Sequence, residues 1–266
     1  MRFESSAVNG KMEATAKVEF AVQMTCQNCV DSIERVLSKV PEIKNISINL
    51  KNEQVIVETS LSVAETQNLI ESSGLKAVFK GFGTAGGNPN FSAAVAMLSG
   101  RSSVIGVVRF LQIKDDKCLI DGTIDGLSPG EHGLHVHELG DLSNGCQSVG
   151  NHYNPFNKKH GGRDDTERHV GDLGNVTADK EGRATFRFED KLLCVPNIIG
   201  RSLVITADRD DLGKRNVGTS SQDGNSGARR LACGVIARSP GIFENPKKIC
   251  LCDGTSIWDE TNPLNL

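Results

Sequence analysis

The chain lacks three features that mark common classes of protein. Lys and Arg total 30 against 33 Asp and Glu, a formal net charge of -3, so the basic excess typical of nucleic-acid-binding proteins is absent. No stretch approaches the roughly 18 consecutive apolar residues of a membrane span, and the first residues hold no apolar signal segment. We therefore expect no nucleic-acid partner, no membrane span and a soluble, cytoplasmic protein, with other intracellular compartments left open.

Cysteines are also too few for a secreted disulfide scaffold, since only eight are spread unevenly over 266 residues. Two close pairs stand near the ends of the chain, Cys26 with Cys29 and Cys250 with Cys252, and all six histidines lie between them. Thiolates suit Cu(I) or zinc, whereas imidazole with carboxylate suits zinc or Cu(II). The ends and the middle can therefore bind different metals.

The first part of the chain has the pattern of a small α+β domain. Four segments alternate as strands do and two have the period of helices: 14–23, 43–50, 53–59 and 75–81, and 29–40 and 63–72. Their order, βαββαβ, predicts a ferredoxin-like domain over 14–82. We expect residues 1–13 to be a disordered extension, with Met1 and Met12 both open as the start. The glycine-rich stretch 83–90 is predicted to be a linker.

The first cysteine pair, in Met24-Thr-Cys26-Gln-Asn-Cys29, falls between a predicted strand and a predicted helix. The dipole and free backbone N–H groups of a helix N-terminus favour thiolate over thiol. Two exposed thiolates can hold Cu(I) and leave room for a third, incoming thiolate, which transfer requires. Two structural cysteines in a loop are the alternative. A zinc ribbon would need a second close pair in the same unit, and none lies between Cys29 and Cys118.

This motif in this context resembles the heavy-metal-associated domain of small copper chaperones and copper pumps. The resemblance covers roughly residues 14–82. It implies copper binding at Cys26 and Cys29, with Met24 as a buried residue that supports the loop.

Residues 91–239 contain many short strand-like runs between Gly, Asp, Asn and Pro clusters, which predicts an all-β sandwich or barrel. In His135-Val-His137 the two imidazoles share one face of a strand, because side chains alternate. Further along follow three histidines and one aspartate at spacings of 8, 9 and 3 residues: His152, His160, His169 and Asp172. Three imidazoles and one carboxylate make a closed tetrahedral zinc site.

The runs GLHVHELGD at 133–141, GNHYNPFNKKHGG at 150–162 and DDLGK at 210–214 resemble Cu/Zn superoxide dismutase. The resemblance extends over nearly all of 91–239. It implies an eight-stranded Greek-key barrel, a disulfide between Cys146 and Cys233, and a dimer interface built partly from the disulfide-bonded loop and the last strand.

One departure from the dismutase pattern stands at Thr206. The family holds copper with four histidines; His135, His137 and His152 match three of them, and Thr206 occupies the fourth position. A threonine hydroxyl is a poor ligand for copper, and no histidine follows His169. We therefore expect no competent dismutase, with residual copper at the three histidines as an alternative. The remaining cysteines are expected to be buried small hydrophobic residues: Cys118 and Cys194.

The last stretch, 240–266, has little periodicity and predicts an irregular tail. In Cys250-Leu-Cys252 one intervening residue lets both sulfurs face one side, which suits a bridging Cu(I) site or a readily exchanged disulfide. Trp258 is either an anchor for the tail or an ordinary packed aromatic.

Taken in order, the three segments resemble the family of copper chaperones for superoxide dismutase. The resemblance implies Cu(I) at Cys26 and Cys29, heterodimer docking of the central domain on Cu/Zn superoxide dismutase, and copper transfer and thiol-disulfide exchange at Cys250 and Cys252. Zn(II) would be structural. A homodimer and a copper importer as donor are left open. A divergent superoxide dismutase with weak activity and a Cu(I) buffer are the alternatives.

Overall fold

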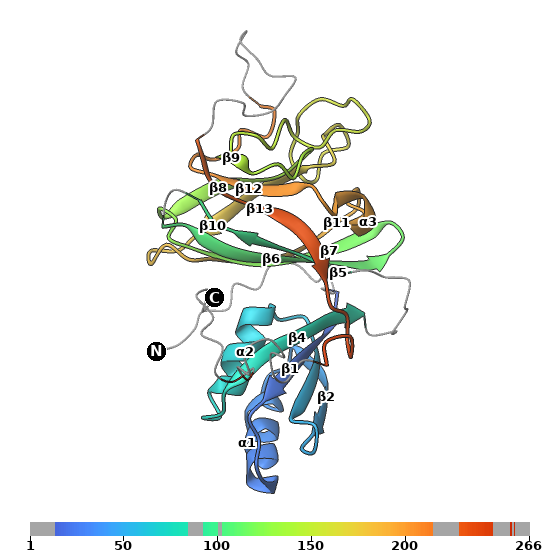
Figure 1. The fold of residues 1–266 in the computed structure, drawn as a ribbon, viewed down its shortest axis with the longest axis vertical. Coiled ribbons are helices and arrows are strands. Elements are labelled where there is room, and N and C mark those ends of the chain that lie inside the picture. Colours follow the sequence, from blue (N-terminus) through green and yellow to red (C-terminus); the bar gives the residue numbers. More distant parts are fainter. Residues whose placement is uncertain are drawn as a thin grey trace.

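The computed structural model describes residues 14–84, 93–100, 103–214 and 229–246, together with residues 256 and 258. These residues form a small α+β domain and a larger β-barrel (Figure 1). The predicted extension 1–13, most of the predicted linker, and both Cys250 and Cys252 lie outside the described residues. Among the described residues, no helix is long and apolar enough to cross a membrane.

The N-terminal domain consists of β1 (Ala16–Val22), α1 (Gln27–Leu37), β2 (Ile43–Asn49), β3 (Gln54–Thr59), α2 (Val63–Glu71) and β4 (Ala77–Thr84). The four strands form an antiparallel sheet in the order β2-β3-β1-β4, which confirms the predicted βαββαβ fold. Alternate residues of the strands and one face of α1 meet in a buried core that includes Val18, Phe20, Ile33 and Val57. Strand β4 continues to Thr84, two residues beyond the predicted end of the domain, because Gly83 and Thr84 still pair with β1.

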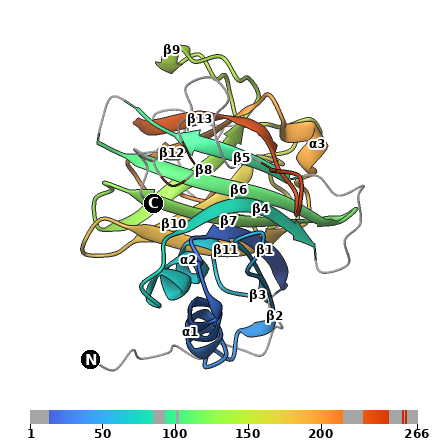
Figure 2. The same cartoon turned by 60° about the horizontal axis from the view of Figure 1, so that its bottom comes forward.

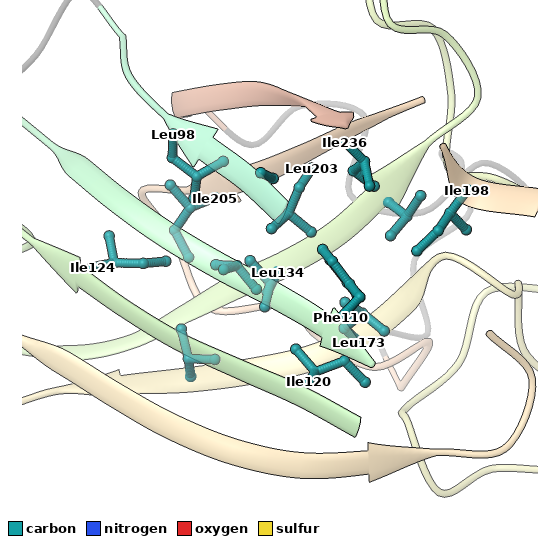
Figure 3. Packing of buried hydrophobic residues seen from close by; sticks show 14 of the residues in the cluster. Leu98, Phe110, Ile120, Ile124, Leu134, Leu173, Ile198, Leu203, Ile205 and Ile236 are labelled. Atoms are coloured by element: carbon teal, nitrogen blue, oxygen red, sulfur yellow. The ribbon is translucent and has the colours of Figure 1, made fainter. Parts of the chain in front are cut away.

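The barrel consists of β5 (Ala93–Leu98), β6 (Ile105–Lys114), β7 (Lys117–Asp125), β8 (Gly130–His137), β9 (Ser143–Cys146), β10 (Asp172–Ala178), β11 (Ala184–Asp190), α3 (Val195–Ile198), β12 (Ser202–Thr206) and β13 (Arg230–Ser239). Eight strands follow one another in the order β10-β8-β12-β13-β5-β6-β7-β11, and the two end strands lie side by side. The predicted eight-stranded barrel is therefore confirmed. Its interior is filled by large apolar side chains such as Phe110, Leu134 and Ile205 (Figure 3).

A long loop between β8 and β10 carries β9 and is fastened to the barrel by a disulfide. Cys146 in the loop is bonded to Cys233 of β13, with their Cα atoms 5.7 Å apart and their positions separated by 87 in the sequence. The disulfide packs against Val149 and Val204 in a small cluster of its own. This bond fixes the position of the loop that holds the later histidines.

Buried charges join the two domains. The guanidinium of Arg187 on β11 donates to the carbonyl of Leu61 at 2.8 Å and to the carboxylate of Asp121 at 3.0 Å. Asp121 on β7 in turn accepts the backbone N–H of Val63, the first residue of α2, at 3.2 Å. A carboxylate at a helix N-terminus is favourably placed, because the backbone N–H groups there have no partner within the helix. The N-terminal domain thus lies against the face of the barrel formed by β6, β7 and β11 (Figures 1 and 2).

Candidate metal centres

The first cysteine pair lies at the exposed N-terminus of α1. Cys26 is the residue that caps the helix, and its backbone remains extended, whereas Cys29 lies within the first turn. The two sulfurs are 3.7 Å apart, and Thr25 Oγ1 lies 3.9 Å from Cys29 Sγ. Cys26 is exposed and Cys29 partly exposed, while Met24 behind them is buried in the domain core. The pair therefore faces solvent with an open side.

Hydrogen bonds from the backbone of Thr25, and then of Cys26, lower the pKa of the Cys29 thiol to about 7. These groups stabilise the thiolate because their hydrogen atoms point toward the sulfur. The thiolate is the form that binds a soft metal ion. Near neutral pH a large part of Cys29 is therefore already a thiolate, and the pair can bind a metal ion directly.

The four residues predicted to bind zinc come together around one carboxylate. The Nδ1 atoms of His152, His160 and His169 lie 2.8, 3.0 and 3.3 Å from the oxygens of Asp172. Their potential ligand atoms all lie within 4.8 Å of one another, and all four residues are buried. Asp172 also accepts the backbone N–H groups of Gly161 at 3.1 Å and of His169 at 2.9 Å.

The donor set fits a zinc ion. Burial alone would raise the pKa of Asp172, but contact with the three imidazoles holds it well below its usual range. Burial would likewise lower the pKa of His160, yet the carboxylates of Asp172 and Asp210 raise it to about 10. The two carboxylates therefore attract a positive charge at the centre of the group. Three buried ring nitrogens of the group make no hydrogen bond, although two of them lie close to the Asp172 carboxylate. They are His160 Nδ1 and both nitrogens of His169.

Asp210 is a residue that the sequence analysis missed. Its carboxylate oxygens lie 3.0 Å from Nε2 of His135 and 2.7 Å from Nε2 of His160. Asn175 holds it in place, since Asn175 Oδ1 accepts the backbone N–H of Asp210 and Asn175 Nδ2 donates to its carbonyl. Asp210 thus connects the predicted zinc group to the histidine pair of β8. The run DDLGK was noted in the sequence, but nothing in its spacing indicates this bridge.

The histidines matched to a copper site are arranged differently from the zinc group. The rings of His135 and His152 are stacked, with centroids 4.0 Å apart and planes 20° apart, and Nδ1 of His137 lies 3.0 Å from the carbonyl of Gly150. In the described ranges, two sets of residues each have all their potential ligand atoms within 4.8 Å of one another. The trio of His135, His137 and His152 is not one of these sets. Residual copper at this trio stays a prediction.

Thr206 ends β12 on the same outer face as His135. The register pairs Val204 with His135, and Thr206 follows two residues later, so both side chains point the same way. Thr206 is only 4% exposed, and its hydroxyl lies 2.9 Å from the carbonyl of Asp208, to which it donates. The position that would need a fourth imidazole therefore holds a hydroxyl already engaged with the backbone.

Two family models cover most of the chain: the heavy-metal-associated domain matches residues 19–76, and copper/zinc superoxide dismutase matches residues 104–236. The copper chaperone for superoxide dismutase of Mus musculus is 56% identical over 91% of this chain and 88% of its own length. That of Homo sapiens is 53% identical over 95% of this chain and 91% of its own length. The chain belongs to the family of copper chaperones for superoxide dismutase.

Other relatives match the barrel alone. Superoxide dismutase [Cu-Zn] A of Xenopus laevis is 49% identical over 55% of this chain and 98% of its own length. The crystal structure of the clock protein EA4 is 44% identical, with a TM-score of 0.52, and covers 57% of this chain and 97% of its own. The predicted membership of the copper chaperone family is confirmed, since relatives that match nearly the whole chain bear the chaperone name rather than that of the enzyme.

The other cysteines of this copper chaperone family member serve different purposes. Cys146 and Cys233 form the disulfide that the dismutase resemblance implies. Cys118 is fully buried, and burial raises the pKa of its thiol far above the ordinary value. Cys194 is partly exposed, contrary to the expectation of a buried residue, because it lies at the N-terminus of the short helix α3.

One apolar surface lies beside the disulfide. It consists of exposed Met97, Leu139, Ile199 and Val235. Strands β5 and β13 run side by side through Met97 and Val235, and the backbone at Gly140, next to Leu139, closely approaches that at Gly200, next to Ile199. Clustered exposed apolar side chains in a polar surround are typical of protein interfaces.

Proposed function

We propose that the chain delivers Cu(I) to Cu/Zn superoxide dismutase and promotes formation of the client's intrasubunit disulfide. In this proposal Cys26 and Cys29 bind the cargo, and Cys250 and Cys252 hand it over. The observation that carries the proposal is the exposed sulfur pair, 3.7 Å apart at the start of α1, because an open pair leaves copper accessible to an incoming thiolate.

The tail cysteines also account for the proposed disulfide step. After the copper has been handed over, an external two-electron oxidant such as dioxygen would convert the two tail thiols into a disulfide between Cys250 and Cys252. One client thiolate would attack this disulfide to form a mixed disulfide, and the second client thiolate would then displace the tail. Two electrons pass from the client thiols to the tail, which leaves as a dithiol, and the client gains one disulfide. A pair separated by a single residue suits this exchange better than long-term storage of a disulfide.

The apolar surface of Met97, Leu139, Ile199 and Val235, which we call the docking face, supports a heterodimer with the client. Val235 on β13 and Leu139 in the disulfide-bonded loop belong to the segments that the dismutase resemblance assigns to the dimer interface. Burying exposed apolar side chains of this kind against an apolar partner surface is favourable, because it removes them from water. A second copy of the chain is the alternative occupant of the same face. The immediate donor of copper and the cytoplasmic location stay predictions.

In this proposal zinc is structural. His152, His160, His169 and Asp172 would hold it, and it would supply order to the loop that carries the first three of them. Arg168 reinforces the same loop from within, since its guanidinium donates to the carbonyl of Asp172 at 3.0 Å and to the carboxylate of Asp190 at 2.6 Å. The ordered loop in turn keeps Leu139 in the docking face.

The experiment mixes the copper-loaded chain with zinc-loaded, reduced superoxide dismutase and measures both disulfide formation and dismutase activity in the client. We expect the double variant Cys250→Ser/Cys252→Ser to slow both by at least about tenfold. Val235→Glu places a charge in the docking face, and we expect it to raise the concentration needed for half-maximal rate. Normal maturation by the double variant would favour a Cu(I) buffer, and strong dismutation by the purified chain alone would favour an enzyme.

A further inference from the structure

A buried carboxylate of the N-terminal domain binds the backbone that follows the barrel. Glu19 lies in the middle of β1 and is 1% exposed. One of its oxygens accepts a hydrogen bond from Nε2 of Gln54 at 2.7 Å, and the other accepts one from the backbone N–H of Phe243 at 2.6 Å. Because a buried carboxylate is costly without partners, the contact with Phe243 is part of what allows Glu19 to be buried.

The neighbouring strand β4 is shaped to receive the same segment. A Cβ on Gly81 would lie 2.4 Å from the carbonyl oxygen of Gly241, and one on Gly83 would lie 2.7 Å from Cγ1 of Ile242. Between these glycines, the backbone N–H of Phe82 donates to the carbonyl of Pro240 at 3.3 Å. Glycine at both positions therefore lets the backbone of residues 240–242 approach closely.

Phe243 is held by its backbone and not by its ring. Its side chain is 69% exposed, and its φ of 66° lies in the left-handed region that bulky residues rarely adopt. A short turn supports this conformation, since Glu244 N donates to Gly241 O at 3.2 Å and Gly241 N donates to the Glu244 carboxylate at 2.9 Å. Strained backbone persists where the surrounding contacts determine it.

The tail touches the same domain again beyond the second cysteine pair. Lys76 Nζ donates a hydrogen bond to the backbone carbonyl of Trp258. The carbonyl of Lys76 itself accepts the N–H of Gln23, three residues before Cys26, at 3.0 Å. The contact of Trp258 is thus made through its backbone.

We propose that Glu19 is a positioning residue that fixes the start of the cysteine-bearing tail on the N-terminal domain. We call Glu19 with residues 240–244 the Glu19 clamp. The inference rests on the proposed function, because it concerns how the two cysteine pairs meet. The clamp holds the segment at Phe243, so the chain that precedes Cys250 starts beside β1 and not at the end of β13.

The length of the chain limits how far each cysteine pair can lie from the clamp. Cys26 lies seven residues after Glu19, and Cys250 lies seven residues after Phe243. At about 3.6 Å per residue, each pair can lie no more than about 25 Å from the clamp. Without the clamp, the tether would start at Ser239, the last residue of β13, and Cys250 lies eleven residues after Ser239. A shorter tether that starts on the same domain raises the effective concentration of one pair at the other.

Two variants of the full chain open the clamp from opposite sides. In Glu19→Gln a single amide oxygen replaces the two carboxylate oxygens, so Gln54 and Phe243 compete for one acceptor. In Gly83→Val the new side chain strikes Ile242, to which all three of the nearest atoms belong, and valine suits a strand. Glu58→Gln is the matched control, because it removes one charge from β3, where Glu58 faces Lys17 in register.

The first measurement is amide hydrogen exchange of residues 241–244. We expect slow exchange at Phe243 in the wild type and at least about tenfold faster exchange in Glu19→Gln and Gly83→Val, with β1 and β3 unchanged. Phe243→Asn keeps the N–H and tolerates positive φ, so it should exchange slowly like the wild type. Free-peptide exchange of the Phe243 amide in the wild type overturns the clamp. Fast exchange in Phe243→Asn overturns the assignment to Glu19, since the ring would then hold the segment.

The second measurement tests positioning. The copper-free protein is equilibrated in a glutathione redox buffer, and mass spectrometry counts disulfides between the two pairs relative to disulfides within each pair. We expect Glu19→Gln and Gly83→Val to lower this ratio by about threefold or more, and Glu58→Gln to leave it unchanged. An unchanged ratio with an opened clamp overturns the positioning role. Normal client maturation by Cys250→Ser/Cys252→Ser would instead overturn the proposed function and leave the exchange of Phe243 unaffected.

Discussion

The histidine group of the barrel and the cysteine pair of α1 present their ligand atoms in opposite ways. Asp172 is fully buried and lies within 3.3 Å of three imidazoles, so a metal there would be enclosed on every side by protein atoms. Cys26 is exposed, and its only close sulfur neighbour among the described residues is Cys29 at 3.7 Å. A closed ligand set retains its ion, whereas an open pair can exchange it.

The two regions also differ in what their ligands do for the fold. Asp172 accepts N–H groups from Gly161 and His169, so the carboxylate orders the backbone of the loop as well as its side chains. Cys26 and Cys29 lie at the N-terminus of a helix whose inner face is buried through residues such as Ile33 and Leu37, and of the two cysteines only the partly exposed Cys29 also packs against this core. Loss of a ligand should therefore affect the fold strongly in the barrel and chiefly metal binding at α1.

The largest effect is expected from Asp172→Asn. The amide cannot accept from all the groups around the carboxylate and carries no charge to attract a cation. We expect zinc content after dialysis to fall by about a hundredfold and stability to fall by about 3 kcal/mol, or roughly 6–12 °C in Tm. Metal analysis and calorimetry measure both. Glu167→Gln is the control, because Glu167 is exposed in the same loop and its carboxylate pairs with exposed Lys158 at 3.1 Å. Zinc retained by Asp172→Asn would contradict a closed site.

A smaller effect is expected from Thr206→His, which adds an imidazole on the face that already holds His135. The reason is that copper then gains the ligand that a hydroxyl, engaged with Asp208, cannot supply. We expect dismutase activity of the copper-loaded protein to rise by about tenfold. Thr206→Val, which adds no ligand, should give no gain. Unchanged activity of Thr206→His with copper shown to be bound would mean that the barrel fails as an enzyme for another reason.

Much of both regions could be predicted from the sequence. Period-two and period-3.6 patterns gave the order of elements in the N-terminal domain, because the apolar residues of β1 and α1 face one core. Close spacing of residue types pointed to His152, His160, His169 and Asp172, which the fold brings together. These features are local, so a single chain segment contains the information.

Contacts between distant segments could not be predicted in this way. Asp210 lies 75 residues from His135, and Glu19 lies 224 residues from Phe243. A lone glutamate in an alternating strand predicts a solvent-facing side chain, yet Glu19 is buried because another segment covers it. Gly83 was predicted to begin the linker, but it is a strand residue, and together with Gly81 it leaves space for residues 241 and 242.

The smallest expected effect concerns the pH dependence of the open pair. With the pKa of Cys29 lowered from 9.0 to about 7, half of this thiol is ionised at pH 7. The gain in thiolate is about fiftyfold over an unshifted thiol, but a thiolate of lower pKa is intrinsically less nucleophilic.

We expect Cys29 of the copper-free protein to react with iodoacetamide about fivefold faster in the folded protein at pH 7 than in urea at the same pH. Its rate should level off above about pH 8, where ionisation is nearly complete, whereas the rate in urea should still rise steeply through about pH 9. Mass spectrometry of the Cys29 peptide separates it from Cys118, which is buried and should not react. A Cys29 rate that climbs to pH 9 in the folded protein would mean that the backbone of Thr25 and Cys26 does not stabilise the thiolate, and the open pair would then differ from the closed group only in exposure.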